Sequence, residues 1–467
     1  MKPDANGSPS QDSHGANHSL PESYQTVSVP HAKAGFWRQW KAFSGPAILI
    51  SVGYMDPGNW GTDLAAGAQF KYGLLWIVAL ASFMAVILQV ISARLGVATG
   101  KDLAQCSRDY YPRWMRWPNW ITMEIAVIAT DLAEALGSAV ALNLLFHIPI
   151  SWAIVITAFD VVLLLSLQGM GMRMIEAVVG VFVLTIGVCY GIEIFVLPQT
   201  QPVFAEMAGA LVRPDLRQAG MIVVAIGMIG ATVMPHNLYL HSALVQSRKF
   251  GRDDNSIRTA IKFNTVDAVV ALSIAFLVNA AILVLAAMVF HGKDSVVAAG
   301  GQIVAFTPDS DWIRIAHLTL APLLGTAAAS TLFAVALLAS GQSSTITGTL
   351  AGQVVMEGFM NWRLRPWLRR LLSRLLAVVP AIIIISIRGS GSVTDLVNLS
   401  QVILCLILPF AMLPLLHFTS SRKIMGQWRN GWILLILGWA SAIVITAMDL
   451  YSLPESLHEA WRIIVGK

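Results

Sequence analysis

The chain has 467 residues, of which 56% are hydrophobic and only 12% are charged. Soluble domains are nearer a quarter charged, so these values exclude an ordinary soluble protein and indicate a surface that mostly faces lipid. The net charge of +5 lies in short connections between apolar runs, unlike a nucleic-acid surface, and Cys106, Cys189 and Cys405 are too scattered for a disulfide scaffold or a cysteine metal site.

Residues 1–43 are rich in Ser, Pro, Asn, Gly and His and contain no apolar run. This composition predicts a disordered tail, and it lacks the basic-then-apolar pattern of a cleaved signal peptide. Three histidines of this tail are either loose metal ligands or, more simply, ordinary polar residues. They are His14, His18 and His31.

Eleven apolar runs follow, and each is long enough to cross the bilayer core, which takes about 20 residues per helix. They are residues 44–70, 74–97, 119–145, 149–168, 174–197, 219–246, 262–290, 318–350, 368–387, 396–418 and 431–450. If the N-terminus is cytoplasmic, the cytoplasmic segments hold 22 Lys and Arg residues and the opposite side holds 8. Because basic residues concentrate in cytoplasmic loops, we expect the N-terminus inside and the C-terminus outside. The end of the chain, 453–467, has apolar residues at helical spacing and is predicted to lie on the membrane surface.

Spans one and six are each interrupted by a proline at mid-membrane. Span one reads GYMDPGN over 53–59, and span six reads ATVMPHN over 231–237. Proline has no backbone N–H, so the carbonyls of Gly53 and Ala231, four residues before the two prolines, lose their helical partners. Unpaired backbone groups in lipid are tolerated only where protein, water or an ion satisfies them.

The two interrupted spans hold the same position in two blocks of five spans, 44–197 and 219–418. An odd number of spans inverts the second block relative to the first. Interrupted helices at corresponding positions of inverted repeats are a pointer to a transporter's binding site. A pair of ordinary proline kinks is the alternative, but it leaves the ligand-type side chains beside both prolines unexplained.

The side chains at the two breaks are those of Asp56, Asn59, Met234 and His236. An ionised Asp at the bilayer centre costs roughly 2.5–3.5 kcal/mol, so Asp56 requires a partner such as a cation or a proton. Mg²⁺ and Ca²⁺ prefer sites made only of oxygen, whereas the sulfur of Met234 favours a transition metal. Packing is the alternative role for Met234.

Titratable side chains recur within the spans in a pattern typical of a proton relay. At about 100° per residue, the three acids of span three line one face of a helix. A structural cluster of ion pairs is the alternative, above all for Glu124 with Arg369. The candidate relay residues of spans three, six and nine are Glu124, Asp131, Glu134, His236, His241, Arg369 and Arg370. Other acids within spans are interpreted as ordinary hydrogen-bonding groups of a helix bundle; they are Asp160, Glu176, Glu193 and Asp267.

Two stretches, SVGYMDPGNWGTDLAAGAQFKYGLLW and GMIGATVMPHNLYLHSALVQSR, resemble the two signature helices of the Nramp family of proton-coupled divalent-metal transporters. The resemblance extends from residue 44 to about residue 450 and includes ATDLAEALGSAVAL in span three. It implies an all-α, multi-pass protein of the bacterial cell membrane with a LeuT-like fold. That fold consists of a 5+5 inverted repeat, followed here by one additional span.

The resemblance also implies a function and a set of site residues. The protein would be a symporter of the manganese/iron branch that brings Mn²⁺ or Fe²⁺, and also Cd²⁺, Co²⁺ or Zn²⁺, into the cytoplasm with protons. No bound cofactor, nucleic acid or obligate protein partner is expected. The implied metal ligands are Asp56, Asn59, Met234, the carbonyls of Gly53 and Ala231 and, in some states, Gln401. The residues implied in proton movement are Asp56, His236, Asp131, Glu134, Arg369 and Arg370.

Some details qualify the resemblance. Position 53 is Gly where many relatives have Ala, which should not matter if only its carbonyl binds metal. Position 407 is Ile where relatives often have a second Gln, which places a water-binding role there in doubt. The presence of Met234 argues against the magnesium-transporting offshoot of the family, and His236 remains open as a metal ligand.

Three other functions are opposed by the sequence. An intramembrane metalloenzyme would need a zinc motif such as HExxH, which does not occur, and His236 and His241 lie about 140° apart around a helix. A metal-gated channel would not need paired breaks and an acidic relay. An amino-acid transporter of similar architecture would not place Asp56 at the centre of its site.

Overall fold

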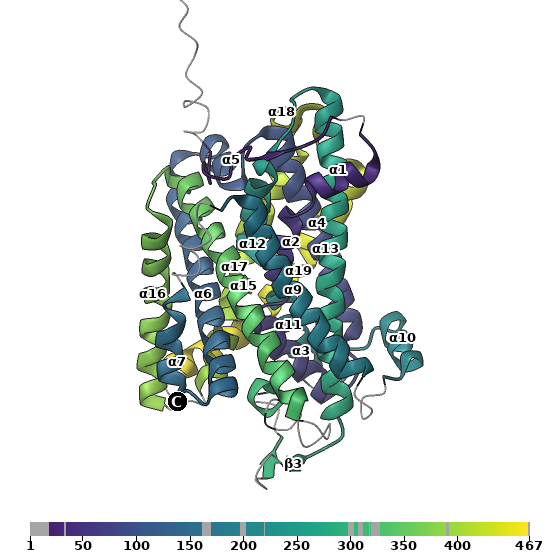
Figure 1. Ribbon diagram of the computed structural model, residues 1–467, viewed down its shortest axis with the longest axis vertical. Helices are drawn as coiled ribbons and strands as arrows, with labels where there is room; N and C mark the ends of the chain where they lie inside the picture. Colours follow the sequence, from purple (N-terminus) through teal and green to yellow (C-terminus); the bar gives the residue numbers. More distant parts are fainter. Residues whose placement is uncertain are drawn as a thin grey trace, which may run out of the picture.

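The long helices stand side by side in an upright bundle, with α1, α5 and α18 at one end and β3 at the other (Figure 1). This computed structural model describes residues 18–31, 34–160, 170–196, 202–218, 220–297, 303–306, 312–316, 318, 327–388 and 392–465. The two ends of the bundle correspond to the two faces of the membrane predicted from the sequence.

Among the described residues, nine helical stretches are long and apolar enough to cross a membrane. They are α4 (Leu75–Thr99), α6 (Arg116–Phe146), α9 (Met172–Phe195), α11 with α12 (Met221–Thr232 and Pro235–Leu244), α13 (Asp254–Val289), α15 (Ala327–Met360), α16 (Pro366–Arg388), α17 (Ser392–Ser420) and α19 (Trp432–Val465). The first predicted span consists of two shorter helices, α2 (Pro46–Val52) and α3 (Pro57–Phe70). Part of the fourth predicted span lies outside the described residues, and its first half forms α7 (Ile150–Thr157). Eleven membrane crossings therefore remain a prediction.

Short elements connect the spans. The helical ones are α1 (Phe36–Phe43), α5 (Leu103–Tyr110), η3 (Arg113–Met115), α10 (Phe204–Val212), η4 (Val245–Ser247), α18 (Arg422–Met425) and η5 (Gly426–Trp428). Strands β1 (Val27–Ser28) and β2 (Arg248–Lys249) pair in parallel, and β3 (Ser295–Val297) and β4 (Ile303–Ala305) pair antiparallel.

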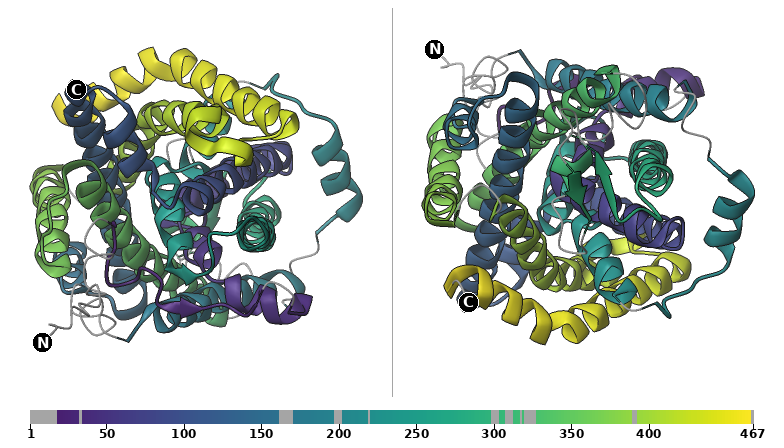
Figure 2. Two further views of the ribbon diagram at one scale, coloured as in Figure 1. Left: turned by 90° about the horizontal axis from the view of Figure 1, so that it is seen from above. Right: turned by 90° about the horizontal axis from the view of Figure 1, so that it is seen from below.

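Small residues allow the central helices to approach one another closely, as is usual in membrane bundles. A Cβ added at Gly67 of α3 would lie 2.2 Å from the Leu283 carbonyl oxygen of α13. A Cβ added at Gly96 of α4 would lie 2.1 Å from the carbonyl oxygen of Ser242 in α12. In contrast, α19 runs along the rim of the bundle (Figure 2), where it packs against α17, α4 and α11.

The N-terminal part of the chain corrects one expectation. Residues 18–31 and 34–43 are ordered, although the composition of 1–43 predicts a disordered tail. The side chains of Leu20 and Val27 are buried, and β1 pairs with β2 more than 200 positions later, so this segment is held by distant parts of the chain. His18 stacks on Tyr24 at 3.8 Å between ring centroids, and the His31 carbonyl accepts a hydrogen bond from Gln39. His14 lies outside the described residues.

We call residues 18–31 the strap, because they fasten two spans to each other. The backbone N–H of Leu20 donates to Glu357 Oε2 at the end of α15 over 3.1 Å. The backbone N–H of Gln25 donates to the Gln246 carbonyl in η4, directly after α12, over 3.0 Å. The strap therefore links the end of span six to the end of span eight at one face of the bundle.

Two buried acids of the spans serve packing, as their simpler interpretation predicts. Asp267 of α13 accepts hydrogen bonds from the N–H groups of Gly45 and Ala47 and so satisfies the N-terminus of α2. Glu176 of α9 forms an ion pair with the buried Arg248 of β2. These contacts fix the direction in which α2 enters the bundle.

Candidate metal centre

The first break lies between α2 and α3. Backbone hydrogen bonds of 2.9–3.1 Å tighten the chain after α2 ends at Val52. The next helix begins at Pro57, with Asp56 as its N-cap, and Asp56 Oδ1 accepts the N–H of Asn59 over 3.0 Å. Asp is a favoured N-cap and Pro a favoured first helical residue, so the Asp-Pro pair itself fixes where the helix restarts.

The second break lies between α11 and α12. Helix α11 ends at Thr232, Val233 and Met234 are extended, and α12 begins at Pro235. As in the first break, the proline has no N–H to offer the carbonyl four residues earlier, here that of Ala231. Each break therefore lies directly before a proline, as the sequence predicts.

The two breaks lie against each other. A Cβ added at Gly53 would be 2.2 Å from Nδ2 of Asn237, which lies just past the second break. An alanine at position 53 would therefore require the Asn237 amide to turn away. That this position tolerates either residue stays a prediction. A Cβ added at Gly58 would be 2.2 Å from Nε2 of Gln401, which places α17 at the start of α3.

Several buried oxygens at the breaks have no hydrogen-bond partner in the part of the chain that the structure describes. Those of the predicted metal ligands are Asp56 Oδ2, Asn59 Oδ1 and Gln401 Oε1, and Asn237 Oδ1 is a fourth; all four residues are at most 4% exposed. Asn59 donates its Nδ2 to the Tyr54 carbonyl over 2.5 Å, so its amide is oriented with Oδ1 unused. A buried polar atom without a partner costs about 1–3 kcal/mol, which a bound cation would recover at these oxygens.

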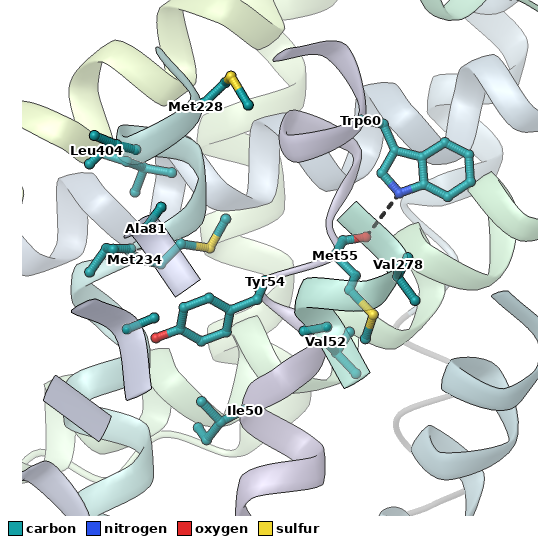
Figure 3. Packing of buried hydrophobic residues seen from close by; sticks show 14 of the residues in the cluster. Ile50, Val52, Tyr54, Met55, Trp60, Ala81, Met228, Met234, Val278 and Leu404 are labelled. Atoms are coloured by element: carbon teal, nitrogen blue, oxygen red, sulfur yellow. Dashed lines mark hydrogen bonds between the residues drawn. The ribbon is translucent and has the colours of Figure 1, made fainter. Parts of the chain in front are cut away.

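A sulfur atom joins this set of oxygens. Met234 is fully buried, and Figure 3 shows its thioether directed toward the chain around Tyr54. Among the described residues, no group of three His, Cys, Asp or Glu side chains comes together as a metal cluster. A metal at the breaks would instead use one carboxylate, amide and backbone carbonyl oxygens, and one thioether.

The two histidines of span six face different helices. His236 Nδ1 lies 3.2 Å from Thr130 Oγ1 of α6. His241 Nδ1 lies 2.9 Å from Gln89 Oε1 of α4, and Gln89 donates to the Tyr54 hydroxyl. His236 therefore connects the second break to α6, whereas His241 supports the first break from the side of α4.

Helices α6 and α16 bring the predicted acids and arginines together. Arg369 Nη2 lies 2.9 Å from Glu124 Oε2, and this pair is partly exposed. Deeper in the bundle, Arg370 Nη1 bonds Asp131, and Arg370 Nη2 lies 3.4 Å from Glu134 Oε2. The acids and arginines selected from the sequence thus form direct ion pairs, and their role in proton movement stays a prediction.

Two members of this cluster were not selected from the sequence. Arg374 bonds Asp160 through Nη2 and donates to the Asp131 carbonyl through Nη1 over 2.8 Å. Arg374 lies four residues after Arg370 and so shares its helix face, a signal that the sequence did contain. The count of basic residues uses Arg374 only as a charge that orients the membrane topology, and the sequence predicts for Asp160 only hydrogen bonding within the bundle.

Comparison with known sequences gives a consistent result over nearly the whole chain. The family model described as Natural resistance-associated macrophage protein-like, Nramp, matches residues 47–455. A Divalent metal cation transporter MntH of a Nostoc species is 49% identical over 444 residues, which cover 94% of this chain and 96% of that protein. The MntH protein of a Listeria monocytogenes strain is 46% identical, covering 94% of this chain and 95% of its own length.

Solved structures agree with these relatives. The crystal structure of the Eremococcus coleocola manganese transporter, in complex with an aromatic bis-isothiourea substituted compound, superimposes with a TM-score of 0.84 at 40% identity. This match covers 94% of the present chain and 91% of that one. The nucleobase-cation-symport transporter MHP1 in a closed conformation matches with a TM-score of 0.55 at 13% identity, which indicates a shared fold only.

Proposed function

Since this chain belongs to the Nramp family, we propose that it carries Mn²⁺ or Fe²⁺ into the cytoplasm in symport with protons by alternating access. The observation that carries the proposal is the set of buried oxygens without partners where the two breaks meet. Membership of the family makes the chain a multi-pass membrane transporter of divalent metal cations and not an enzyme.

The proposed metal site consists of Asp56, Asn59, Met234 and the carbonyls of Gly53 and Ala231, with Gln401 joining in some states. Asp56 supplies the only formal charge in this set, so it offsets most of the cost of removing water from a divalent ion. The free oxygens Asp56 Oδ2 and Asn59 Oδ1 support this assignment, because nothing else in the described chain occupies them. No resident cofactor is required, since the metal is the substrate.

The preference for transition metals is assigned to Met234. A thioether adds little to the binding of Ca²⁺ or Mg²⁺ but favours softer ions. Cd²⁺, Co²⁺ and Zn²⁺ are therefore proposed as further substrates, in line with the expectation from the sequence.

The proposed proton route leads from Asp56 past His236 to α6. The contact between His236 and Thr130, at 3.2 Å, supports this direction because Thr130 precedes Asp131 in the chain. Glu134 accepts the proton from this side. Arg369 and Arg370, with Glu124, continue the series of charged groups toward the cytoplasmic face.

In the proposed cycle, the outward-facing state offers a hydrated cavity to Asp56, and the ion exchanges some of its waters for the site's donor atoms. A proton passes toward Glu134. Spans one and six then rock against the surrounding helices, and the metal leaves to the cytoplasm. An inside-negative potential favours this direction by about 2.3 kcal/mol per charge per 100 mV.

The test is uptake into proteoliposomes with an internal pH indicator, using Mn²⁺, Fe²⁺, Cd²⁺, Zn²⁺, Ca²⁺ and Mg²⁺ in turn. We expect transport of the transition metals, accompanied by acidification of the lumen. Metal flux without acidification would support a channel or a uniporter and contradict symport.

The matched variant for this test is Asp56→Asn, which keeps the size of the side chain and its capping oxygen but removes the charge. We expect Mn²⁺ uptake to fall to near background while insertion into the membrane stays normal. Transport at the wild-type rate by Asp56→Asn would overturn the assignment of the metal site.

A further inference from the structure

The inner part of the ion-pair cluster contains an unequal number of charges. We define the inner cluster as Asp131, Glu134, Asp160, Arg370 and Arg374, whose side chains are at most 2% exposed. It has three carboxyl groups and two guanidinium groups, and a guanidinium remains charged at any physiological pH. Fully ionised, the inner cluster would carry a net charge of −1 inside the membrane, which is costly. One bound proton makes it neutral.

The contacts indicate which carboxyl group holds that proton. Asp131 is bonded directly to Arg370, and Asp160 is bonded directly to Arg374. Each of the three acids has one oxygen without a partner among the described residues, but the other oxygen of Glu134 has only the 3.4 Å contact to Arg370 Nη2. Glu134 is therefore the least compensated acid of the three and the one that accepts the proton.

Asp160 competes with Glu134 for the same nitrogen atom. Arg370 Nη2 lies 3.4 Å from Glu134 Oε2 and 3.5 Å from Asp160 Oδ2. Arg374 holds Asp160 in this position, and Thr345 of α15 donates its hydroxyl to the same Asp160 oxygen over 3.3 Å. The charge of Asp160 thus draws the Arg370 guanidinium away from full pairing with Glu134.

Among the described residues, the other helices that pack near Glu134 add no charged group to the three carboxyl and two guanidinium groups of the inner cluster. Helix α15 meets it at Gly348, where a Cβ would lie 2.8 Å from Glu134 Oε1. Helix α12 contacts α6 through His236, and Pro57 of α3 contacts α6 at Gly137. In α17, His417 lies within hydrogen-bond distance of Tyr111, away from the cluster. The outer pair of Glu124 with Arg369 is neutral by itself.

We infer that Asp160 and Arg374 are positioning residues that set the number of protons the inner cluster holds to one and direct that proton to Glu134. This inference rests on the proposed proton route through Glu134. Neither residue touches the metal ligands in the described structure, so changing them alters proton coupling while metal binding persists.

The charge count predicts opposite effects for the two single variants. Asp160→Asn leaves two acids and two arginines, so the cluster is neutral without a proton. We expect proton uptake per Mn²⁺ to fall several-fold and the pH dependence of transport to move to lower pH by about one unit or more. Arg374→Gln removes a positive charge, so the pH dependence should move to higher pH.

The double variant Asp160→Asn with Arg374→Gln decides between a charge effect and a merely structural one. It restores the net charge of −1, with two acids and one arginine, so proton coupling and the pH dependence should return toward wild type. A structural role predicts that the double variant is at least as impaired as either single variant. Asp449→Asn is the matched control, because Asp449 is a buried acid of α19 that bonds Cys405 outside the cluster.

The measurements are Mn²⁺-driven acidification and Mn²⁺ uptake between pH 5 and 8 in proteoliposomes, with Mn²⁺ affinity by calorimetry as a check on folding. If Asp160→Asn is not recovered from the membrane, Arg374→Gln and the double variant still test the charge count. Single variants whose pH profiles coincide with wild type would overturn the inference. Glu134→Gln separates a failure of the proton route from a failure of the inference about Asp160 and Arg374. If Glu134→Gln keeps normal acidification, the proposed proton route itself fails. If it loses acidification, that route stands.

Discussion

Met234 is the residue at which selectivity can be separated from activity. Replacement by alanine leaves the charge of Asp56 and the oxygens of the site in place, and water can fill the vacated position. The site then offers only oxygen donors, which Ca²⁺ and Mg²⁺ prefer. We expect Met234→Ala to keep part of its Mn²⁺ transport, lose more Cd²⁺ transport and gain Ca²⁺ or Mg²⁺ transport or competition.

The measurement is competition between metals in proteoliposomes, with wild type and variant side by side. If both proteins show the same preference between Ca²⁺ and Cd²⁺, Met234 serves packing. Selectivity would then have to come from the size or geometry of the site.

Asp102 gives a pH dependence of stability that is independent of transport. It caps α5 outside the membrane-spanning helices, where its Oδ1 accepts the N–H of Gln105 and its own N–H donates to the Gln105 side chain. Burial raises the pKa of Asp102 from its ordinary value of 3.8 to about 6, although hydrogen bonds from Ser19 and Gln105 oppose this rise. A raised pKa means that the folded state favours the protonated carboxyl. The stability that the protonated Asp102 contributes is therefore fully present below pH 3.8 and is lost as the pH rises through about 6.

The variant Asp102→Asn keeps a good N-cap without a charge. At pH 7.5 we expect its apparent melting temperature in detergent to exceed that of wild type. The ionised Asp102 of the wild type lowers the free energy of unfolding by up to about 3 kcal/mol at this pH, because a pKa difference of one corresponds to about 1.36 kcal/mol. At pH 4.5 this advantage should largely disappear. An equal difference at both pH values would contradict a buried, titrating Asp102.

At the level of single residues, the sequence identified the site through a purely local signal. A proline in an apolar run breaks a helix wherever the rest of the chain lies, so Asp56 and Met234 could be located without a structure. The pairing of Asp160 with Arg374 could not, because it joins residues 214 positions apart and depends on how the helices pack. The same applies to the near contact between Gly53 and Asn237.

Among the elements, the strap makes a prediction about local opening. It joins the ends of α12 and α15 through two hydrogen bonds, one to the Glu357 side chain and one to the Gln246 carbonyl, and through the two-residue pairing of β1 with β2. Hydrogen bonds contribute about 0.5–1.5 kcal/mol each, so deletion of residues 1–31 should raise amide exchange in residues 242–249 and 353–360 about tenfold or more.

Hydrogen–deuterium exchange measures this directly, and the amides of β3 and β4 at the opposite end of the bundle are the internal control. Glu357→Ala removes one attachment of the strap and should give a smaller effect in the same direction. Unchanged exchange in both regions after the deletion would show that the strap does not fasten these helices.

The elements also show where pattern-based prediction ends. The apolar runs predict the long helices well, because hydrophobic length alone determines which segments suit a membrane. The strap was missed because a two-residue strand has no pattern of its own and depends on β2, a distant partner. The boundaries proposed for the two repeats, 44–197 and 219–418, and the surface position of 453–467 remain predictions.

For the whole molecule, the all-α, LeuT-like fold expected from the sequence is confirmed by the superposition on the manganese transporter and, for the fold alone, on MHP1. Its orientation in the membrane remains to be measured. The three native cysteines are buried, so single cysteines introduced on the surface can be labelled with little background.

We predict that Asp294→Cys, before β3, reacts with an impermeant maleimide on intact cells, whereas Lys423→Cys, in α18, reacts only after the cells are opened. The reason is the excess of basic residues on the side that carries α18. Labelling of Lys423→Cys on intact cells would reverse the proposed orientation.

Three arginines in the first half of α16 restrict how this helix can move in the bundle. One side of α16 exposes large apolar residues such as Leu376 and Ile387, while Arg369, Arg370 and Arg374 are buried on the other. A rotation of α16 about its own axis by half a turn would turn these guanidiniums toward hydrocarbon, where an arginine at the bilayer centre costs roughly 2.5–3.5 kcal/mol even on the most lenient scale. The buried arginines therefore prevent α16 from rotating about its own axis. Spans one and six can then move against a helix that keeps its orientation.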